Sequence, residues 1–193
     1  MRIRAEYYVG PELRFLANLD MKRMMERCLR RTSIPFALSE GFNPQIKLSM
    51  GTVLPVGIWG EKEYFDIELK EPMDPLHFQE ALNEVLPNGA RINTCKEIDM
   101  QAPALMKVIN AASYAFLLEK GYPLEEIKGS LINSESLIVK SRGKKKDVDK
   151  DLKAGILDIE VKADIKFDII KLLVAVGQPI NVRYDELLQL LYQ

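Results

Sequence analysis

The chain has 193 residues, of which 47% are hydrophobic and 28% are charged, and its formal net charge at pH 7 is −1. This length allows one large domain or two small ones with separate cores, and the near-neutral charge excludes a global field that favours nucleic acid, so any basic patch must be local. No run of about 18 apolar residues occurs, and the charged N-terminal sequence MRIRAEYYVG is unlike a signal peptide, so we expect a cytoplasmic protein without membrane contact.

Residues that bind metals or form disulfides are sparse. Cys28 and Cys95 are isolated in the sequence, and His77 is the only histidine. Isolated cysteines suit a reducing compartment and give no disulfide framework. A structural zinc site needs about four ligands, mostly Cys and His. We therefore expect that the chain binds no structural metal.

The first half of the chain alternates strand and helix signals. Apolar residues at every second position predict a strand over residues 2–9. A helix is expected from about Leu19 to Arg31, with Asn18 or Asp20 as its N-terminal cap. The same patterns predict the other elements of this half, which are strands at 34–38, 46–50, 63–70 and 90–99 and a helix at about 75–86 with Asp74 as N-cap and Pro75 at its first position.

The alternation of 34–38 resumes at 46–50, and with these two segments counted as one strand the order strand, helix, two strands, helix, strand matches the ferredoxin-like split βαβ pattern. Residues 100–105 are polar and contain a proline, which indicates a linker. The second half repeats the plan in degenerate form, with strands expected at 113–120, 136–141, 146–150, 155–162 and 165–174 and helices at 123–131 and 183–192. The prediction is an α+β fold of two packed ferredoxin-like (βαββαβ) units with mostly antiparallel sheets, in residues 1–99 and 106–193.

The predicted helix between residues 19 and 31 is amphipathic and basic. It contains five basic and two acidic residues, a local net charge of +3. Arginines recur at helical spacing on one face, at positions Arg23, Arg27, Arg30 and Arg31. This face is either a solvated surface that suits the negative end of the helix dipole or a phosphate-binding surface.

A turn, Glu40–Pro44, follows the helix, and its Gly41 can supply a positive φ. The turn is either purely structural or a ligand loop in which Phe42 is a stacking platform and Asn43 a hydrogen-bonding group. The flanking strands are short, so we expect Lys47 to lie close to this turn.

The end of the basic helix is also expected near the turn, because the helix must pack on the sheet that these strands join. Arg27 and Arg31 are one helical turn apart, so both guanidinium groups can approach a single phosphate. The predicted RNA- or anion-binding site therefore consists of Asn18, Asp20, Arg23, Arg27, Arg31, Ser39, Phe42, Asn43 and Lys47.

Several notable side chains also have simpler interpretations. Asp20 is better explained as a cap or an arginine partner than as a general base. Cys28 falls on the apolar side of the helix, as an inert core thiol does. Trp59, in a Gly-rich loop, is a lid, an interface residue or a partial core plug, and 144–146 is a run of lysines in a solvated turn.

The run from Arg14 to Asp66 resembles a known family. The motifs that carry the resemblance are Arg14-Phe15-Leu16, Leu19-Asp20, Arg30-Arg31, Ile34-Pro35, Ser39-Glu40-Gly41-Phe42-Asn43-Pro44, Lys47-Leu48-Ser49 and Glu63-Tyr64-Phe65-Asp66. They are similar to the radical-SAM-linked domain of unknown function, which is often fused to a radical SAM protein or encoded beside one. The resemblance implies a radical SAM partner that carries a 4Fe–4S cluster and SAM. This chain lacks the CxxxCxxC cluster motif, so we expect no cofactor of its own.

Two positions depart from the family pattern. Asn18 stands where many members have a histidine before Leu-Asp, and Gln45 stands where many have the histidine of Asn-Pro-His-Pro-Lys. A binding role survives these changes better than a catalytic one. The resulting expectation is an RNA-recognising accessory domain, not an enzyme on its own, that works with a radical SAM partner in tRNA or rRNA modification. The alternatives are an RNA-processing endoribonuclease on paired ferredoxin-like units, or a protein-binding adaptor that docks through Met24, Met25 and Trp59.

Overall fold

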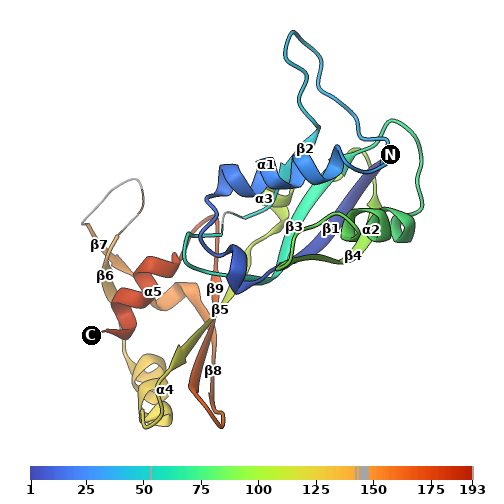
Figure 1. The fold of residues 1–193 in the computed structure, drawn as a ribbon. Coiled ribbons are helices and arrows are strands. Elements are labelled where there is room, and N and C mark those ends of the chain that lie inside the picture. Colours follow the sequence, from blue (N-terminus) through green and yellow to red (C-terminus); the bar gives the residue numbers. More distant parts are fainter. Residues whose placement is uncertain (53, 142, 144–147, 193) are drawn as a thin grey trace. The chain divides into compact units, whose positions relative to one another are not determined.

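The computed structural model describes residues 1–52, 54–141, 143 and 148–192, and the chain divides into two compact units, Met1–Val108 and Ile109–Gln193 (Figure 1). The lysine run at 144–146 lies outside the described residues. No helix in the described part of the chain is both long and apolar enough to cross a membrane.

The N-terminal unit is a four-stranded antiparallel sheet with helices. Its elements are β1 (Arg2–Val9), a 3-10 turn (Pro11–Leu13), α1 (Asn18–Leu29), β2 (Leu48–Met50), β3 (Gly60–Glu68), α2 (Pro75–Asn83), β4 (Ala90–Ile98) and the short α3 (Leu105–Val108). The strands lie in the order β2-β3-β1-β4, and every neighbouring pair is antiparallel. The antiparallel sheet expected for this half of the chain is confirmed.

The period of two in β1 and β3 decides which face of this sheet is buried. Ile3, Ala5, Tyr7 and Val9 are buried and pack with Phe65 and Ile67 of β3 against α1 and α2. Met21, Met24, Met25, Cys28 and Leu29 supply the α1 side of this core, and Phe78 and Leu82 supply the α2 side. Burial of this apolar face drives the packing of both helices onto one side of the sheet.

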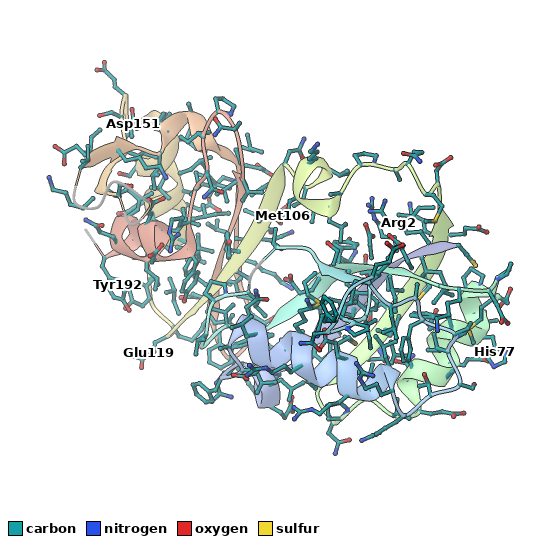
Figure 2. The ribbon with its side chains drawn as sticks, turned by 90° about the horizontal axis from the view of Figure 1, so that it is seen from above. Arg2, His77, Met106, Glu119, Asp151 and Tyr192 are labelled. Atoms are coloured by element: carbon teal, nitrogen blue, oxygen red, sulfur yellow. The ribbon has the colours of Figure 1, made fainter. Side chains whose placement is uncertain are left out.

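The opposite face of the sheet is polar and carries a buried charge cluster. Asp66 accepts hydrogen bonds from Arg2 Nη2 at 2.6 Å and from Arg4 Nε and Nη2 at 2.8 and 2.9 Å. The same guanidinium groups donate to the carbonyls of Ala102 and Pro103, so residues 100–103 are fastened to this face. Figure 2 shows Arg2 on the side of the sheet away from α1, toward the segment that leads into α3.

Of three predictions about helix caps and a short strand, one is confirmed and two are wrong. Asp74 caps α2 as expected, because its Oδ1 accepts from the N–H groups of Leu76 and His77. The predicted capping of α1 by Asn18 or Asp20 is wrong: the N-cap is Ala17 and it has no side-chain cap bond, while Asn18 is already helical. Residues 34–38 form isolated bridges, Phe36 to Leu69 and Leu38 to Ile46, and not a continuous strand.

The C-terminal unit has its own core and two separate sheets. Its elements are β5 (Ala111–Leu118), α4 (Leu124–Asn133), β6 (Ile138–Lys140), β7 (Asp149–Asp151), a 3-10 turn (Lys153–Gly155), β8 (Ile156–Ala163), β9 (Asp168–Ala175) and α5 (Tyr184–Leu191). An antiparallel sheet has the order β5-β9-β8, and β6 pairs with β7 in a two-stranded sheet.

This arrangement differs from a second copy of the N-terminal sheet. A βαββαβ unit needs a helix between its third and fourth strands, whereas β7 and β8 are joined by residues 152–155, which hold only the 3-10 turn. The next connection, residues 164–167 between β8 and β9, holds no helix either, and α5 follows β9. Four residues are too short for a helix that crosses over a sheet. β8 and β9 therefore pair as an antiparallel hairpin, and β6 and β7 pair with each other in a separate sheet.

Candidate functional site

A groove of about 490 Å³ lies between the last turns of α1 and the segment after α2. From α1 and its C-terminal extension it is lined by Met24, Arg27, Cys28, Arg30 and Arg31, and from the second segment by Glu84, Val85, Leu86 and Pro87. Arg27 and Arg31, two of the predicted site residues, are thus brought together, one turn apart, as the helical spacing indicated.

Arg31 is held in place by the end of α2. Its Nη2 donates to the carbonyl oxygen of Val85 at 2.6 Å, and the Cys28 thiol approaches the same oxygen at 3.5 Å. Carbonyl groups at a helix end lack partners within the helix, so a guanidinium group there satisfies one of them. A guanidinium group has five N–H donors, so this contact leaves others for a ligand.

Arg27 and Arg30 complete the positive side of the groove. Within the described residues, no hydrogen bond or ion pair involves the Arg27 guanidinium, and Arg30 lies 5.9 Å from the centre of the Phe36 ring. Burial raises the pKa of the Cys28 thiol, and the charges of Arg31 and Arg27 oppose that rise. The positive charges of both guanidinium groups therefore reach the same part of the groove, where the Cys28 thiol lies. Glu84 is the acidic residue that lines the groove from the segment after α2.

The turn around Phe42 lies at the tip of a loop, not in the groove. Figure 1 shows the segment between α1 and β2, in light blue, as a long loop that projects away from the sheet and both helices. Ser39 closes this loop: its N–H donates to the Gln45 carbonyl at 2.8 Å, and its Oγ accepts from the Gln45 N–H at 2.9 Å. Phe42 at the tip is fully exposed, and its neighbour Asn43 is exposed.

Lys47 lies on the other side of the sheet from the arginines. It alternates with Ile46 and Leu48, which are buried in the core beneath α1, so its side chain points to the opposite face. There Lys47 Nζ pairs with Glu68 Oε2 at 2.9 Å, and this contact raises the pKa of the lysine. The expected approach of Lys47 to the Arg27 and Arg31 side chains is therefore not found.

The remaining predicted residues lie toward the start of α1. Asp20 pairs with Arg23 at 3.3 Å on the exposed surface of the helix, which matches its interpretation as an arginine partner. Asn18 lines a small cavity, with about 10 Å³ of room, together with Tyr7 and Thr52. The nine predicted residues are thus divided among the groove, the loop tip, the far face of the sheet and the N-terminal half of α1.

Glu63 is a titratable residue that the sequence reasoning missed. It pairs in register with Tyr7 across β1 and β3, on the core side of the sheet, and Thr52 Oγ1 donates to it at 3.3 Å. Burial raises the pKa of Glu63 to about 7, and the Thr52 hydrogen bond opposes that rise. The sequence pattern contained a signal for this burial. Glu63 lies two and four residues before the buried Phe65 and Ile67, so all three side chains are on the same face of the strand.

Replacement of Glu63 by Gln should change how stability depends on pH. A folded-state pKa raised above the ordinary 4.5 means that ionisation disfavours the folded state. Relative to Glu63→Gln, the wild-type free energy of unfolding should be highest below pH ~4.5 and fall as the pH rises to ~7, by no more than about 3 kcal/mol because solvent screens a partly exposed carboxylate. Urea unfolding of both proteins at pH 4 to 8, followed by fluorescence of the single Trp59, measures the difference.

The control for this experiment is Glu61→Gln, which changes an exposed carboxylate in the same strand. It should leave the pH dependence of unfolding close to that of the wild type. Parallel curves for wild type and Glu63→Gln over the whole range would show that Glu63 carries no such shift.

The residues that the structure describes contain no group of three or more His, Cys, Asp and Glu side chains placed to hold a metal ion. A family model described as "Uncharacterized protein conserved in bacteria (DUF2344)" matches residues 2–184. A comparison with curated proteins gives no match.

Proposed function

The chain belongs to the DUF2344 family of bacterial proteins, and within that family we propose that its N-terminal unit is an RNA-binding module whose contact surface is the groove at the end of α1. The observation that carries the proposal is the convergence of Arg27, Arg30 and Arg31 on that groove. Arginine suits phosphate because its planar guanidinium group donates in a fixed fork.

The electrostatics of the groove favour an anionic ligand even though the whole chain has a net charge of −1. The arginines outnumber the one acidic lining residue, Glu84. The apolar part of the lining, which includes Met24 and Leu86, lowers the local polarity and strengthens the attraction of the guanidinium groups for a phosphate. Half or more of the hydrogen bonds that proteins make to nucleic acid go to phosphate and sugar oxygens, and arginine is one of their usual donors.

The broader setting follows from the resemblance in the sequence. We propose that the module serves a radical SAM protein, which carries the 4Fe–4S cluster and SAM, in the modification of tRNA or rRNA, and that it is not an enzyme on its own. We also propose that the N-terminal unit is ferredoxin-like. The element order from β1 to β4 and the sheet order β2-β3-β1-β4 support that assignment.

Removal of Arg27 and Arg31 together should weaken RNA binding and its dependence on salt. Each lost phosphate contact reduces the slope of log K against log salt by about 0.7–0.9. The Arg27→Ala/Arg31→Ala double variant should therefore show a slope shallower by about 1.5 units and, near 0.1 M salt, roughly tenfold or more weaker binding. Fluorescence anisotropy with a bulk tRNA or rRNA fragment, over a salt series, measures both quantities.

Two variants on the same unit serve as matched controls. Arg23→Ala removes a guanidinium group from α1 outside the groove, and Lys47→Ala removes a cation from the other face of the sheet. Both should bind RNA with a slope within about 0.3 of the wild type. If the double variant is folded, as measured by circular dichroism, and binds RNA like the wild type, then the groove is not the RNA-binding site.

A further inference from the structure

The loop tip and the groove of this protein are complementary in chemistry. The tip, defined as residues 38–46, contains no cation, carries one anion at Glu40, and exposes Phe42 completely. The groove has apolar side chains flanked by arginines. The tip therefore offers an aromatic ring and a carboxylate, and the groove offers the matching partners, apolar side chains and guanidinium groups.

The tip is closed on itself, so its exposure does not result from an unfolded loop. Backbone and side-chain bonds between Ser39 and Gln45 close its base, and Leu38 pairs with Ile46 directly below them. Gly41 takes a φ of +114°, a conformation that side chains other than glycine rarely adopt. Phe42 is thus held at the tip with no side chain covering it.

We propose that the tip of one copy of this protein docks in the groove of a second copy, with Phe42 against Met24 and Leu86 and with Glu40 beside Arg27. The negative charge of the tip favours the arginine-lined groove over nucleic acid as the partner of the tip, since Glu40 repels a phosphate backbone. The tip cannot reach its own groove without opening its base, because the loop projects away from α1 and α2 (Figure 1).

Self-association of this kind has a predictable strength and consequence. Each copy carries both a tip and a groove, so two copies can pair through two equivalent contacts about a twofold axis. One phenylalanine buries only about 150–250 Å², so the interface falls well below the roughly 1,200 Å² of a stable complex and the association is weak. Because it occupies the arginines of the proposed RNA site, docking competes with RNA and limits binding at high protein concentration.

The test is sedimentation velocity of RNA-free protein from about 10 to 500 µM, the range in which a weak dimer dissociates. Wild type should show a rising weight-average sedimentation coefficient. Phe42→Ala and Glu40→Arg should each raise the apparent dissociation constant at least tenfold. The charge-exchanged double variant Glu40→Arg/Arg27→Glu should recover association, because it restores the opposite charges.

Ile165→Ala is the matched control, because it removes another almost fully exposed apolar side chain, from the other unit, and should leave association unchanged. A wild type that remains monomeric at 500 µM overturns the proposal, as does a Phe42→Ala variant that associates like wild type. Loss of RNA binding by Phe42→Ala with unchanged association reassigns the ring to base stacking. RNA binding by Arg27→Ala/Arg31→Ala is a separate measurement, so failure of docking and failure of the RNA site are distinguishable.

Discussion

Replacement of Asp66 by alanine should destabilise the N-terminal unit by about 3–5 kcal/mol, because it leaves two largely buried guanidinium groups without their anion. Asp66 is 2% exposed, and the Arg2 and Arg4 side chains that bind it are 13% and 15% exposed. The Arg4 contact uses both Nε and Nη2, which is the strong bidentate geometry of an arginine–carboxylate pair. Its loss should also release residues 100–103 from the sheet.

Equilibrium urea unfolding measures this effect, and Trp59 reports on the N-terminal unit because it is the only tryptophan of the chain. The matched control is Glu68→Ala in the same strand and on the same face. Its partner Lys47 is 43% exposed and Glu68 is 33% exposed, so the change should cost less than about 1 kcal/mol. Equal losses for Asp66→Ala and Glu68→Ala would show that burial of the Asp66 cluster contributes little to stability.

The sequence predicted those elements whose period and capping are local. The alternation in residues 2–9 and 63–70 marks β1 and β3, and the cap and proline at Asp74 and Pro75 mark the start of α2. In each case the decisive interactions lie within a few residues along the chain. The bounds of β1 and the start of α2 lie where they were predicted, and the other boundaries moved by at most three residues, as helix and strand ends commonly do.

Sheet connectivity in the C-terminal unit could not be read in the same way. Strand periods there were recognisable, but alternation does not tell which strands pair. The pairing of β5 with β9 joins residues 50 to 64 positions apart, and β6 with β7 forms a separate ladder. The strands predicted at 155–162 and 165–174 had no helix between them, and this was the available signal that they pair as a hairpin and depart from the βαββαβ order.

The candidate site was predicted only in part, because some of its features are local to one helix and others depend on how distant elements pack. The spacing of Arg27 and Arg31 is a property of one helix, so their convergence followed from the sequence alone. The position of Lys47 depended on which face its strand buries, and the buried neighbours Ile46 and Leu48 decide that face. The contribution of Val85 could not be foreseen, because it requires the packing of α2 beside α1.

Replacement of Glu186 by alanine should destabilise the C-terminal unit by about 3–5 kcal/mol. Glu186 is fully buried, its Oε2 accepts from Lys150 Nζ at 2.6 Å, and the same oxygen accepts from the N–H of Arg183 at 3.1 Å. One carboxylate therefore neutralises a lysine that is only 22% exposed and also satisfies a backbone donor at the start of α5. Alanine removes both contacts and leaves an unfilled space where the buried carboxylate was.

Hydrogen exchange of the β9 amides measures this loss within the C-terminal unit, since the most protected amides of a unit report its global unfolding. Glu186→Gln should lose less than Glu186→Ala, because its amide oxygen still accepts from Arg183 N–H while the charge pairing with Lys150 is gone. The control Asp185→Ala removes the adjacent carboxylate, whose pair with Arg183 is 44–46% exposed, and should cost less than about 1 kcal/mol. If Asp185→Ala and Glu186→Ala lower β9 protection equally, the difference in burial between the two carboxylates does not govern the stability of this unit.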